Sequence, residues 1–197
     1  MAPVYQKLVM YGRKVKKIRI EIHKEIFYEH HLKNLSPPSG SKIDITVTKM
    51  EISNVNILHQ VWGVDLSRCE QRLLEGHSEC YLSFNNGILV GYHWVQFKGK
   101  HYIQQANRYL ILGEGRDFMI YHTRVKDEYQ GKGINRFILS TILDDYLVKG
   151  FRRGMIYTSS NNISNRAGIE KLGFVKYAEI KSLLIGRRYY LLSKQSF

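Results

Sequence analysis

Hydrophobic residues near the start of the chain recur with the period of a helix. Those spaced three and four positions apart are Val4, Leu8, Tyr11, Val15, Ile18 and Ile22. The spacing predicts an amphipathic helix over residues 4–26, although Gly12 weakens it by about 1 kcal/mol relative to alanine. The apolar face of this helix could pack on its own domain or on a dimer partner. The lysines lie largely off this stripe, so an anionic membrane surface is a third possible partner.

A short segment rich in Pro, Ser and Gly follows this predicted helix. Between Lys33 and Lys42 the sequence reads KNLSPPSGSK, which is typical of a linker. We therefore expect a basic N-terminal helical extension over residues 1–33, a linker over residues 34–42 and one domain over residues 43–197.

Strand and helix patterns alternate through this domain. Strands are predicted over residues 43–48, 117–125, 154–160, 174–185 and 188–193. Helices are predicted over residues 53–61, 65–75, 132–149 and 162–172, the last of them ended by Gly173. Residues 79–97 form a predicted hairpin around Asn86-Gly87, and residues 101–112 form either a strand or a loop and a strand. The alternation predicts an α/β fold.

Composition and charge exclude several classes of protein. The chain has 197 residues, 44% of them hydrophobic, and its 2 cysteines are too few for a disulfide framework. We find no segment of transmembrane length and no signal peptide, so the expected location is the cytoplasm. The net charge of +13 indicates an acidic partner: nucleic acid, an anionic membrane or a phosphorylated ligand. Nucleic acid is disfavoured, because basic residues beyond the N-terminus are scattered and no binding motif is present.

The clearest chemical signal is the segment YHTRVKDEYQGKGINR, residues 121–136. A predicted strand is followed by a loop with Gly131 and Gly133, which opens the next helix. Unpaired N–H groups and the helix dipole favour an anion there, and glycines let the backbone approach a phosphate closely. Lys132 and Arg136 add positive charge. The spacing fits neither a P-loop nor a dinucleotide fingerprint.

A second motif, NNISNRAGIEKLGF over residues 161–174, follows the next predicted strand. Together with VKDEYQGKGI, it resembles the GCN5-related N-acetyltransferase (GNAT) superfamily over roughly residues 43–193. The resemblance implies a central mixed, mostly antiparallel sheet flanked by helices. It also implies an enzyme that transfers an acyl group from acetyl-CoA, or another acyl-CoA, to a primary amine in a ternary complex, without a metal.

The resemblance further implies which residues bind coenzyme A. It assigns this role to Thr123, Val125, Gln130, Gly131, Lys132, Gly133, Ile134, Asn135, Arg136, Asn162 and Arg166. Backbone N–H groups from Gln130 to Ile134 would hold the pyrophosphate, and the backbone around Thr123 and Val125 would hold the pantetheine arm. Asn162 has a second interpretation, as the N-cap of its helix.

The catalytic residues stay open between candidates. Many family members carry a tyrosine as general acid where this chain has Ile169. A base must also take a proton from the acceptor's ammonium before the amine attacks. His122 has the better pKa near neutral pH, and Tyr121 has the better register. Because side chains alternate along a strand, both reach one cleft only if a bulge intervenes, and a structural role for either stays open.

The acceptor is predicted from a second resemblance. Residues 69–97 are similar to the corresponding part of acetyltransferases from bacterial surface-polysaccharide gene clusters, which implies an amino sugar as acceptor. A protein N-terminus or lysine is the alternative acceptor, and acyl carrier protein is the alternative donor. A third hypothesis is a nucleic-acid or membrane-binding module on a degenerate acetyltransferase scaffold. A homodimer and contact with the inner membrane face through residues 4–26 also stay open.

Overall fold

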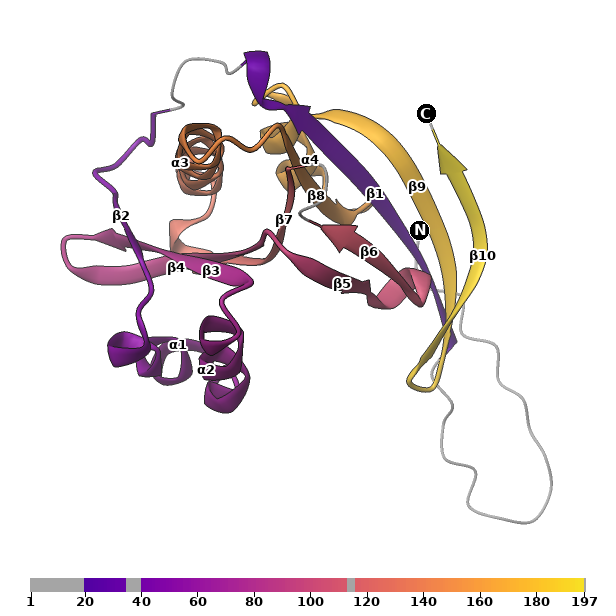
Figure 1. The fold of residues 1–197 in the computed structure, drawn as a ribbon, viewed down its shortest axis with the longest axis horizontal. Coiled ribbons are helices and arrows are strands. Elements are labelled where there is room, and N and C mark those ends of the chain that lie inside the picture. The colour runs from indigo at the N-terminus through magenta and orange to yellow at the C-terminus, as the bar shows by residue number, and fades with distance from the viewer. Residues whose placement is uncertain (1–19, 35–39, 113–115, 197) are drawn as a thin grey trace, which may run out of the picture.

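A computed structural model describes residues 20–34, 40–112 and 116–196. Its centre is an eight-stranded sheet with the strand order β10-β9-β1-β8-β7-β4-β3-β2 (Figure 1). The strands of this sheet are β1 (Ile20–His31), β2 (Thr46–Lys49), β3 (Ser78–Asn85), β4 (Ile88–Gln96), β7 (Asp117–Val125), β8 (Arg153–Ser159), β9 (Val175–Ile185) and β10 (Arg188–Ser196). Strands β7 and β8 run parallel, and the other neighbouring pairs run antiparallel. The prediction of a mixed, mostly antiparallel sheet is confirmed.

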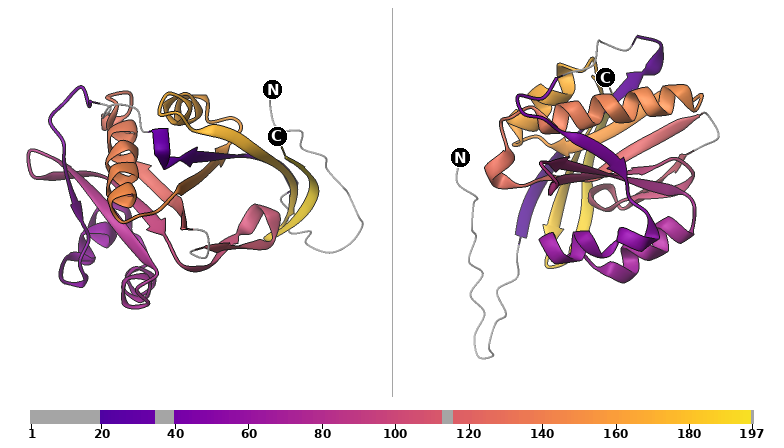
Figure 2. Two further views of the ribbon diagram at one scale, coloured as in Figure 1. Left: turned by 45° about the horizontal axis from the view of Figure 1, so that its top comes forward. Right: turned by 90° about the vertical axis from the view of Figure 1, so that its left-hand side faces the viewer.

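Helices cover both faces of this sheet (Figure 2). Helices α1 (Asn56–Trp62) and α2 (Leu66–Leu74) lie on one face, and α3 (Ile134–Val148) and α4 (Ile163–Glu170) lie on the other. Single 3-10 turns are η1 (Leu32–Asn34), η2 (Ile52–Asn54), η3 (Gln104–Ala106) and η4 (Asp127–Tyr129). Within the described residues, no helix is both long enough and apolar enough to cross a membrane.

Strand β7 shows why the sheet is covered on both sides. Phe118 and Ile120 are fully buried among residues of α3 and α4, whereas Met119 and Tyr121 are buried on the side of α1 and α2. Successive side chains of a strand point to opposite faces, so a strand that is apolar at consecutive positions needs a layer on each face. The apolar run that predicted this strand therefore also accounts for its central place.

The turn between β3 and β4 follows directly from its sequence. Asn86 and Gly87 join the two strands with φ angles of 49° and 75°. Two-residue hairpin turns of this hand need positive φ at both positions, which Asn-Gly adopts at low cost. The predicted hairpin is confirmed.

The helix expected over residues 4–26 is wrong where the structure describes it. Residues 20–31 form strand β1, which pairs with β8 on one side and with β9 on the other. Residues 4–19 lie outside the described part of the chain. The second half of the expected extension, residues 1–33, thus belongs to the sheet.

The reason for this error is the apolar run at residues 26–28. Ile26 and Tyr28 pack on the side of α3 and α4, and Phe27 packs on the opposite face. Consecutive apolar residues that are buried on alternate faces are typical of a central strand. Apolar residues up to Ile22 are spaced as in a helix, but the consecutive apolar residues 26–28 do not continue this spacing.

Residues 101–112 are also more regular than expected. Strands β5 (Gly99–Ile103) and β6 (Arg108–Leu112) form a separate two-stranded sheet, connected through η3. Ile103 and Ala106 of this hairpin pack against Phe27. The β5–β6 hairpin therefore lies over β1 and β9 on the side of the sheet opposite to α3 and α4 (Figure 1).

The place of β1 in the sheet leads to a stability prediction. Tyr28 is fully buried, and its hydroxyl donates to Glu170 of α4 over 2.8 Å, whereas Ile22 on the same strand is 65% exposed. We expect Tyr28→Ala to lower the free energy of unfolding by about 3–5 kcal/mol, as for other deletions of a buried ring. The control Ile22→Ala should lower it by less than about 1 kcal/mol. Urea unfolding of both variants measures this, and equal small losses would contradict a central β1.

Candidate functional site

The site lies where strands β7 and β8 separate. They pair in parallel over four residue pairs, from Asp117↔Arg153 to Ile120↔Ile156, and not beyond. On its other side, β7 pairs with β4, but Tyr92 and Trp94 of β4 lie opposite Arg124 and Tyr121. One residue of β4 thus lies opposite two residues of β7, which is a β-bulge.

His122 and Thr123 form this bulge, and His122 has a φ of 46°. Positive φ is uncommon for a residue other than glycine and requires support from the surrounding structure. The bulge turns the end of β7 away from β8. On the side of β8, the backbone from His122 to Val125 therefore has no strand partner in the described part of the chain.

A groove of about 600 Å³ opens at this separation. It is lined by four segments: the chain before β2, the end of β7, the glycine loop with the start of α3, and α4 with the residues that flank it. Its lining includes the predicted residues Thr123, Val125, Gln130, Gly131, Gly133, Ile134, Asn135, Arg136 and Asn162. The structure thus brings most of the predicted coenzyme residues to one surface.

The glycine loop presents free backbone donors to this groove. Gly131 and Gly133 have φ angles of 73° and 81°, and Gly133 is the N-cap of α3 without a side-chain cap. The N–H groups of Gly131, Lys132 and Gly133 make no hydrogen bond within the described residues. The N–H of Gln130, which was expected to join them, instead donates to the Asp127 carbonyl over 3.1 Å, because η4 closes a turn there.

Positive side chains surround the groove. Lys42, Arg124, Arg136 and Lys171 line it together with one carboxylate, Asp127. The Arg136 Nε is buried and has no hydrogen-bond partner in the described structure. An unsatisfied buried donor next to free backbone N–H groups fits an anionic ligand.

Two of the predicted charged residues lie outside the groove. The ammonium of Lys132 is 4.6 Å from the centroid of the Tyr129 ring. Arg166 donates to the Tyr28 hydroxyl over 3.2 Å and to the Ser160 carbonyl over 3.0 Å. Arg166 thus connects α4 to β1 and to the turn after β8, a contact between distant segments that its place in the motif could not indicate.

Asn162 fits both of its interpretations. Its Oδ1 accepts from the Asn165 N–H over 3.1 Å, which makes it the N-cap of α4. The residue also lines the groove. The cap uses one oxygen, so the amide nitrogen is available to a ligand.

Residues 40–42, at the end of the segment expected to be a linker, form part of the site. The Lys42 N–H and the Ser41 hydroxyl donate to the Lys132 carbonyl over 2.9 and 3.2 Å. A Cβ added at Gly133 would lie 3.5 Å from the Gly40 carbonyl oxygen. The chain before β2 thus lies against the glycine loop and brings Lys42 to the groove, which the local composition did not indicate.

A partly buried series of hydrogen bonds connects the helices beside the groove. His93 Nε2 is 2.6 Å from Asn135 Oδ1, Asn135 donates to Asn165 over 2.8 Å, and Asn165 donates to Thr158 over 3.0 Å. Burial lowers the pKa of His93 to about 4, so its ring is neutral and Nε2 carries the proton given to Asn135. This chain joins β4, α3, α4 and β8. The sequence signal for it was a histidine between Tyr92 and Trp94 in an otherwise apolar strand.

The two candidate bases lie in different environments. Tyr121 is buried, its hydroxyl donates to Ser78 Oγ over 3.3 Å, and burial raises its pKa. His122 is exposed, with its ring centroid 5.1 Å from that of Tyr121. Partial burial of the ring, together with the charge of Arg72, lowers the pKa of His122. The imidazole of His122 is therefore an unprotonated base that a ligand can reach, whereas the Tyr121 hydroxyl keeps its proton and is buried.

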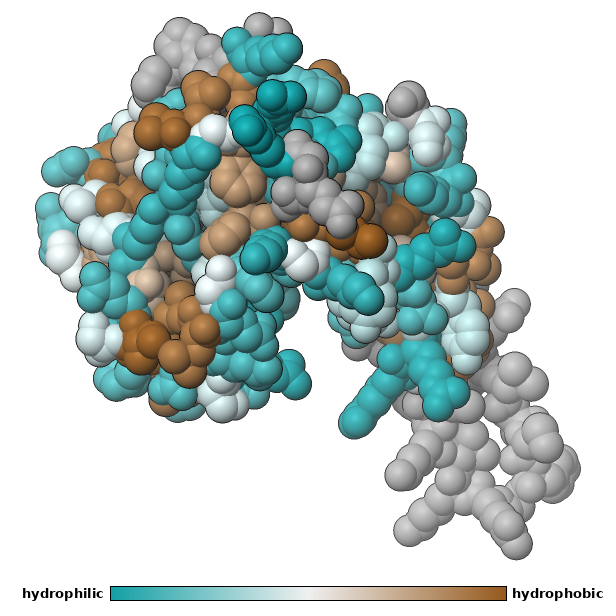
Figure 3. All heavy atoms as spheres, viewed as in Figure 1, coloured by the Kyte–Doolittle hydropathy of each residue, from teal (hydrophilic) through white to brown (hydrophobic). Residues whose placement is uncertain are grey.

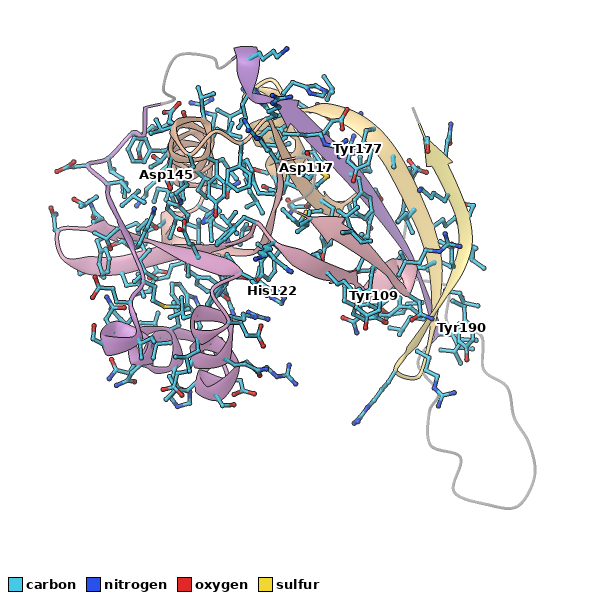
Figure 4. The ribbon with its side chains drawn as sticks, in the orientation of Figure 1. Tyr109, Asp117, His122, Asp145, Tyr177 and Tyr190 are labelled. Atoms are coloured by element: carbon cyan, nitrogen blue, oxygen red, sulfur yellow. The ribbon has the colours of Figure 1, made fainter. Side chains whose placement is uncertain are left out.

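His122 lies on the side of the sheet that carries α2 and the β5–β6 hairpin (Figure 4). The molecular surface is hollowed there, between α1 and α2 on one side and β9 and β10 on the other (Figure 3). Ile169 of α4 stands at the position where many family members carry a tyrosine as general acid, and it is fully buried in the core. No proton donor therefore stands at that position.

A sheet that opens between two parallel strands, beside a glycine loop at a helix start, is an arrangement that suits an anionic ligand. The chain belongs to the acetyltransferase (GNAT) family, whose model matches residues 53–174. The predicted family is confirmed, whereas the surface-polysaccharide type stays a prediction. No match to this chain is found among curated proteins.

Solved structures share the fold at low sequence identity. A GCN5-related N-acetyltransferase from Sphaerobacter thermophilus has a TM-score of 0.61 and 15% identity over 84% of this chain and 52% of its own. The glucosamine N-acetyltransferase region of a fungal multi-domain β-N-acetylglucosaminidase has a TM-score of 0.60 and 13% identity over 84% of this chain and 21% of its own. A Drosophila protein has a TM-score of 0.58 and 9% identity over 85% of this chain and 52% of its own. The chain thus spans about half of the Sphaerobacter and Drosophila proteins.

Proposed function

We propose that the chain transfers an acetyl or other acyl group from acyl-CoA to the primary amine of a small molecule. The observation that supports this most is the groove at the separation of β7 and β8. Free N–H groups of the glycine loop, an unpaired Arg136 and an unpaired strand edge meet there. The phosphates of acyl-CoA match the N–H groups and Arg136, and the amides of its pantetheine arm match the strand edge.

The donor would lie along the groove. The N–H groups of Gly131, Lys132 and Gly133 would bind the pyrophosphate, and Arg136 would add charge. The free edge of β7 between Thr123 and Val125 would hydrogen-bond the pantetheine amides as a further strand does. A structure of AAC(6')-Iy in complex with a CoA-based bisubstrate analogue has a TM-score of 0.52, with 15% identity over 67% of this chain and 91% of its own, which supports a coenzyme A donor on this fold.

Transfer needs a neutral amine at the thioester. His122 would accept a proton from the acceptor's ammonium, directly or through one water. The amine nitrogen then forms a bond to the carbonyl carbon and loses its second proton to solvent, and the carbon–sulfur bond breaks to release the coenzyme A thiolate. Because Ile169 supplies no proton, the thiolate would be protonated by solvent. Positioning of both reactants in the groove would contribute much of the rate.

An amino sugar is the acceptor that we favour. Residues 69–97 gave this expectation, and they include the second part of α2 and the β3–β4 hairpin, next to His122. The fungal relative described above acts on glucosamine according to its name, which makes glucosamine a reasonable first probe. We place the reaction in the cytoplasm, where acyl-CoA is available.

The glycine loop gives the first test of the donor site. Gly131 and Gly186 both have positive φ, 73° and 63°, and open space around an added Cβ, but Gly186 lies in the β9–β10 turn. Valine at either position should cost about 1–2 kcal/mol of stability through backbone strain. We expect Gly131→Val to raise the Kd of coenzyme A at least tenfold in calorimetry. The Gly186→Val control should leave it within twofold, and equal affinity of the two variants would contradict the loop's role.

The base gives the second test. We expect His122→Ala to lower kcat for glucosamine by about 10²–10⁴, with the Kd of coenzyme A unchanged. Burial and Arg72 lower the pKa of His122, so the wild-type enzyme should lose activity only below about pH 6.5, as the ring becomes protonated. That acidic limb should be absent in His122→Ala. The matched control is His59→Ala, at an exposed position on α1, which should keep the wild-type rate. A wild-type rate in His122→Ala together with a loss of activity in Tyr121→Phe would assign the role of base to Tyr121.

A further inference from the structure

Arg72 lies beside the candidate base without an ionic partner. It belongs to the last turn of α2, and its guanidinium carbon is 5.1 Å from the centroid of the Trp94 ring and 5.5 Å from that of Tyr121. The residue is half-buried. Within the described residues it forms no ion pair, although the described chain contains many Asp and Glu side chains in such pairs. A half-buried cation without a counter-ion is a costly arrangement that suggests a missing anionic partner.

The neighbour one turn earlier shows the contrast. Arg68 pairs with Asp65 over 3.3 Å and is exposed. Arg72 instead contacts the faces of aromatic rings, which hold the guanidinium plane and leave its N–H edge to bind a planar or tetrahedral anion. The two arginines of α2 thus differ in function: one belongs to the helix surface and the other to the site.

Among the described residues, the groups that face His122 are uncharged or positive at neutral pH. They are Tyr121 beside it on β7, His101 on β5 and Arg72 on α2. Burial lowers the pKa of His101 to about 4, so that ring is neutral. Arg72 is therefore the one charge among these neighbours.

We propose that Arg72 binds an anionic oxygen group of the acceptor, a carboxylate or a phosphate, and places the acceptor's amine at His122. This inference rests on the proposed acyl transfer and specifies its substrate: an amine that also carries an anion. Binding of that anion would cancel the charge of Arg72 next to His122. The ring then becomes a stronger base when the correct acceptor is present, so recognition and proton transfer are coupled.

The test is an NMR titration of the His122 ring in the full chain. The pKa is measured in chloride and in inorganic phosphate or acetate at equal ionic strength. In the wild type we expect either anion to raise it by about half a pH unit, as for the loss of one charge several Å away in a water-like medium. In Arg72→Met the pKa of His122 in chloride should be higher than in the wild type, and neither phosphate nor acetate should change it. The matched variant Arg68→Met should behave as the wild type.

Two outcomes would overturn the proposal. One is a wild-type pKa that neither phosphate nor acetate moves, and the other is an equal shift in Arg72→Met. Arg72→Lys addresses the case in which Arg72→Met fails to fold. Lysine keeps the positive charge but lacks the planar set of guanidinium N–H donors. We therefore expect a low His122 pKa, as in the wild type, and a smaller shift of this pKa with both anions.

Kinetics distinguish the two anion sources. Wild-type kcat/KM should be at least tenfold higher for glucosamine 6-phosphate than for glucosamine if the anion is a phosphate. It should be at least tenfold higher for β-alanine than for its amide if the anion is a carboxylate. Arg72→Met should lose the preference, and a wild type without either preference would contradict the proposal. Every Arg72 variant should still bind coenzyme A. If the wild type itself does not bind coenzyme A, the acyltransferase proposal is refuted, and not the role of Arg72.

Discussion

The separation of β7 from β8 is the constraint on which the site depends. The two strands stay together for four residue pairs, and then the bulge at His122 and Thr123 turns β7 away. The chain of hydrogen bonds from His93 through Asn135 and Asn165 ties β4 and β8 to the helices at this opening. Each bond contributes about 1 kcal/mol, but leaving one buried member unpaired costs about 1–3 kcal/mol. These hydrogen bonds therefore favour one fixed separation of β7 and β8 over a smaller or larger one.

This opening gives both faces of the sheet a place in the proposed reaction. The glycine loop and the start of α4 lie on the side of α3, where the groove presents N–H groups and positive charge. His122 and Arg72 lie toward the opposite side, with α2 and the β5–β6 hairpin. The donor would enter from one face and the acceptor from the other, and the thioester would lie between the separated strands. This placement of donor and acceptor is that of the proposed ternary complex.

The sequence predicted those features that depend on local chemistry. The Asn86-Gly87 turn, the helix after Gly133 and the capping by Asn162 are each determined by a few neighbouring residues. Features that depend on distant partners were missed. The run at residues 26–28 needed β8 and β9 to be recognised as a strand, and Arg166 needed Tyr28 to explain its position. A charge pattern shows how many cations are present, but not which of them point into a groove.

Amide hydrogen exchange with and without coenzyme A tests the central claim most directly. If the loop N–H groups hold the pyrophosphate, saturating coenzyme A should slow exchange in two segments: residues 131–133 and the β7 edge from His122 to Val125. The β9–β10 turn at Gly186 should exchange at an unchanged rate. Saturable coenzyme A binding that leaves both segments unprotected, or that protects other parts of the chain instead, would contradict the account.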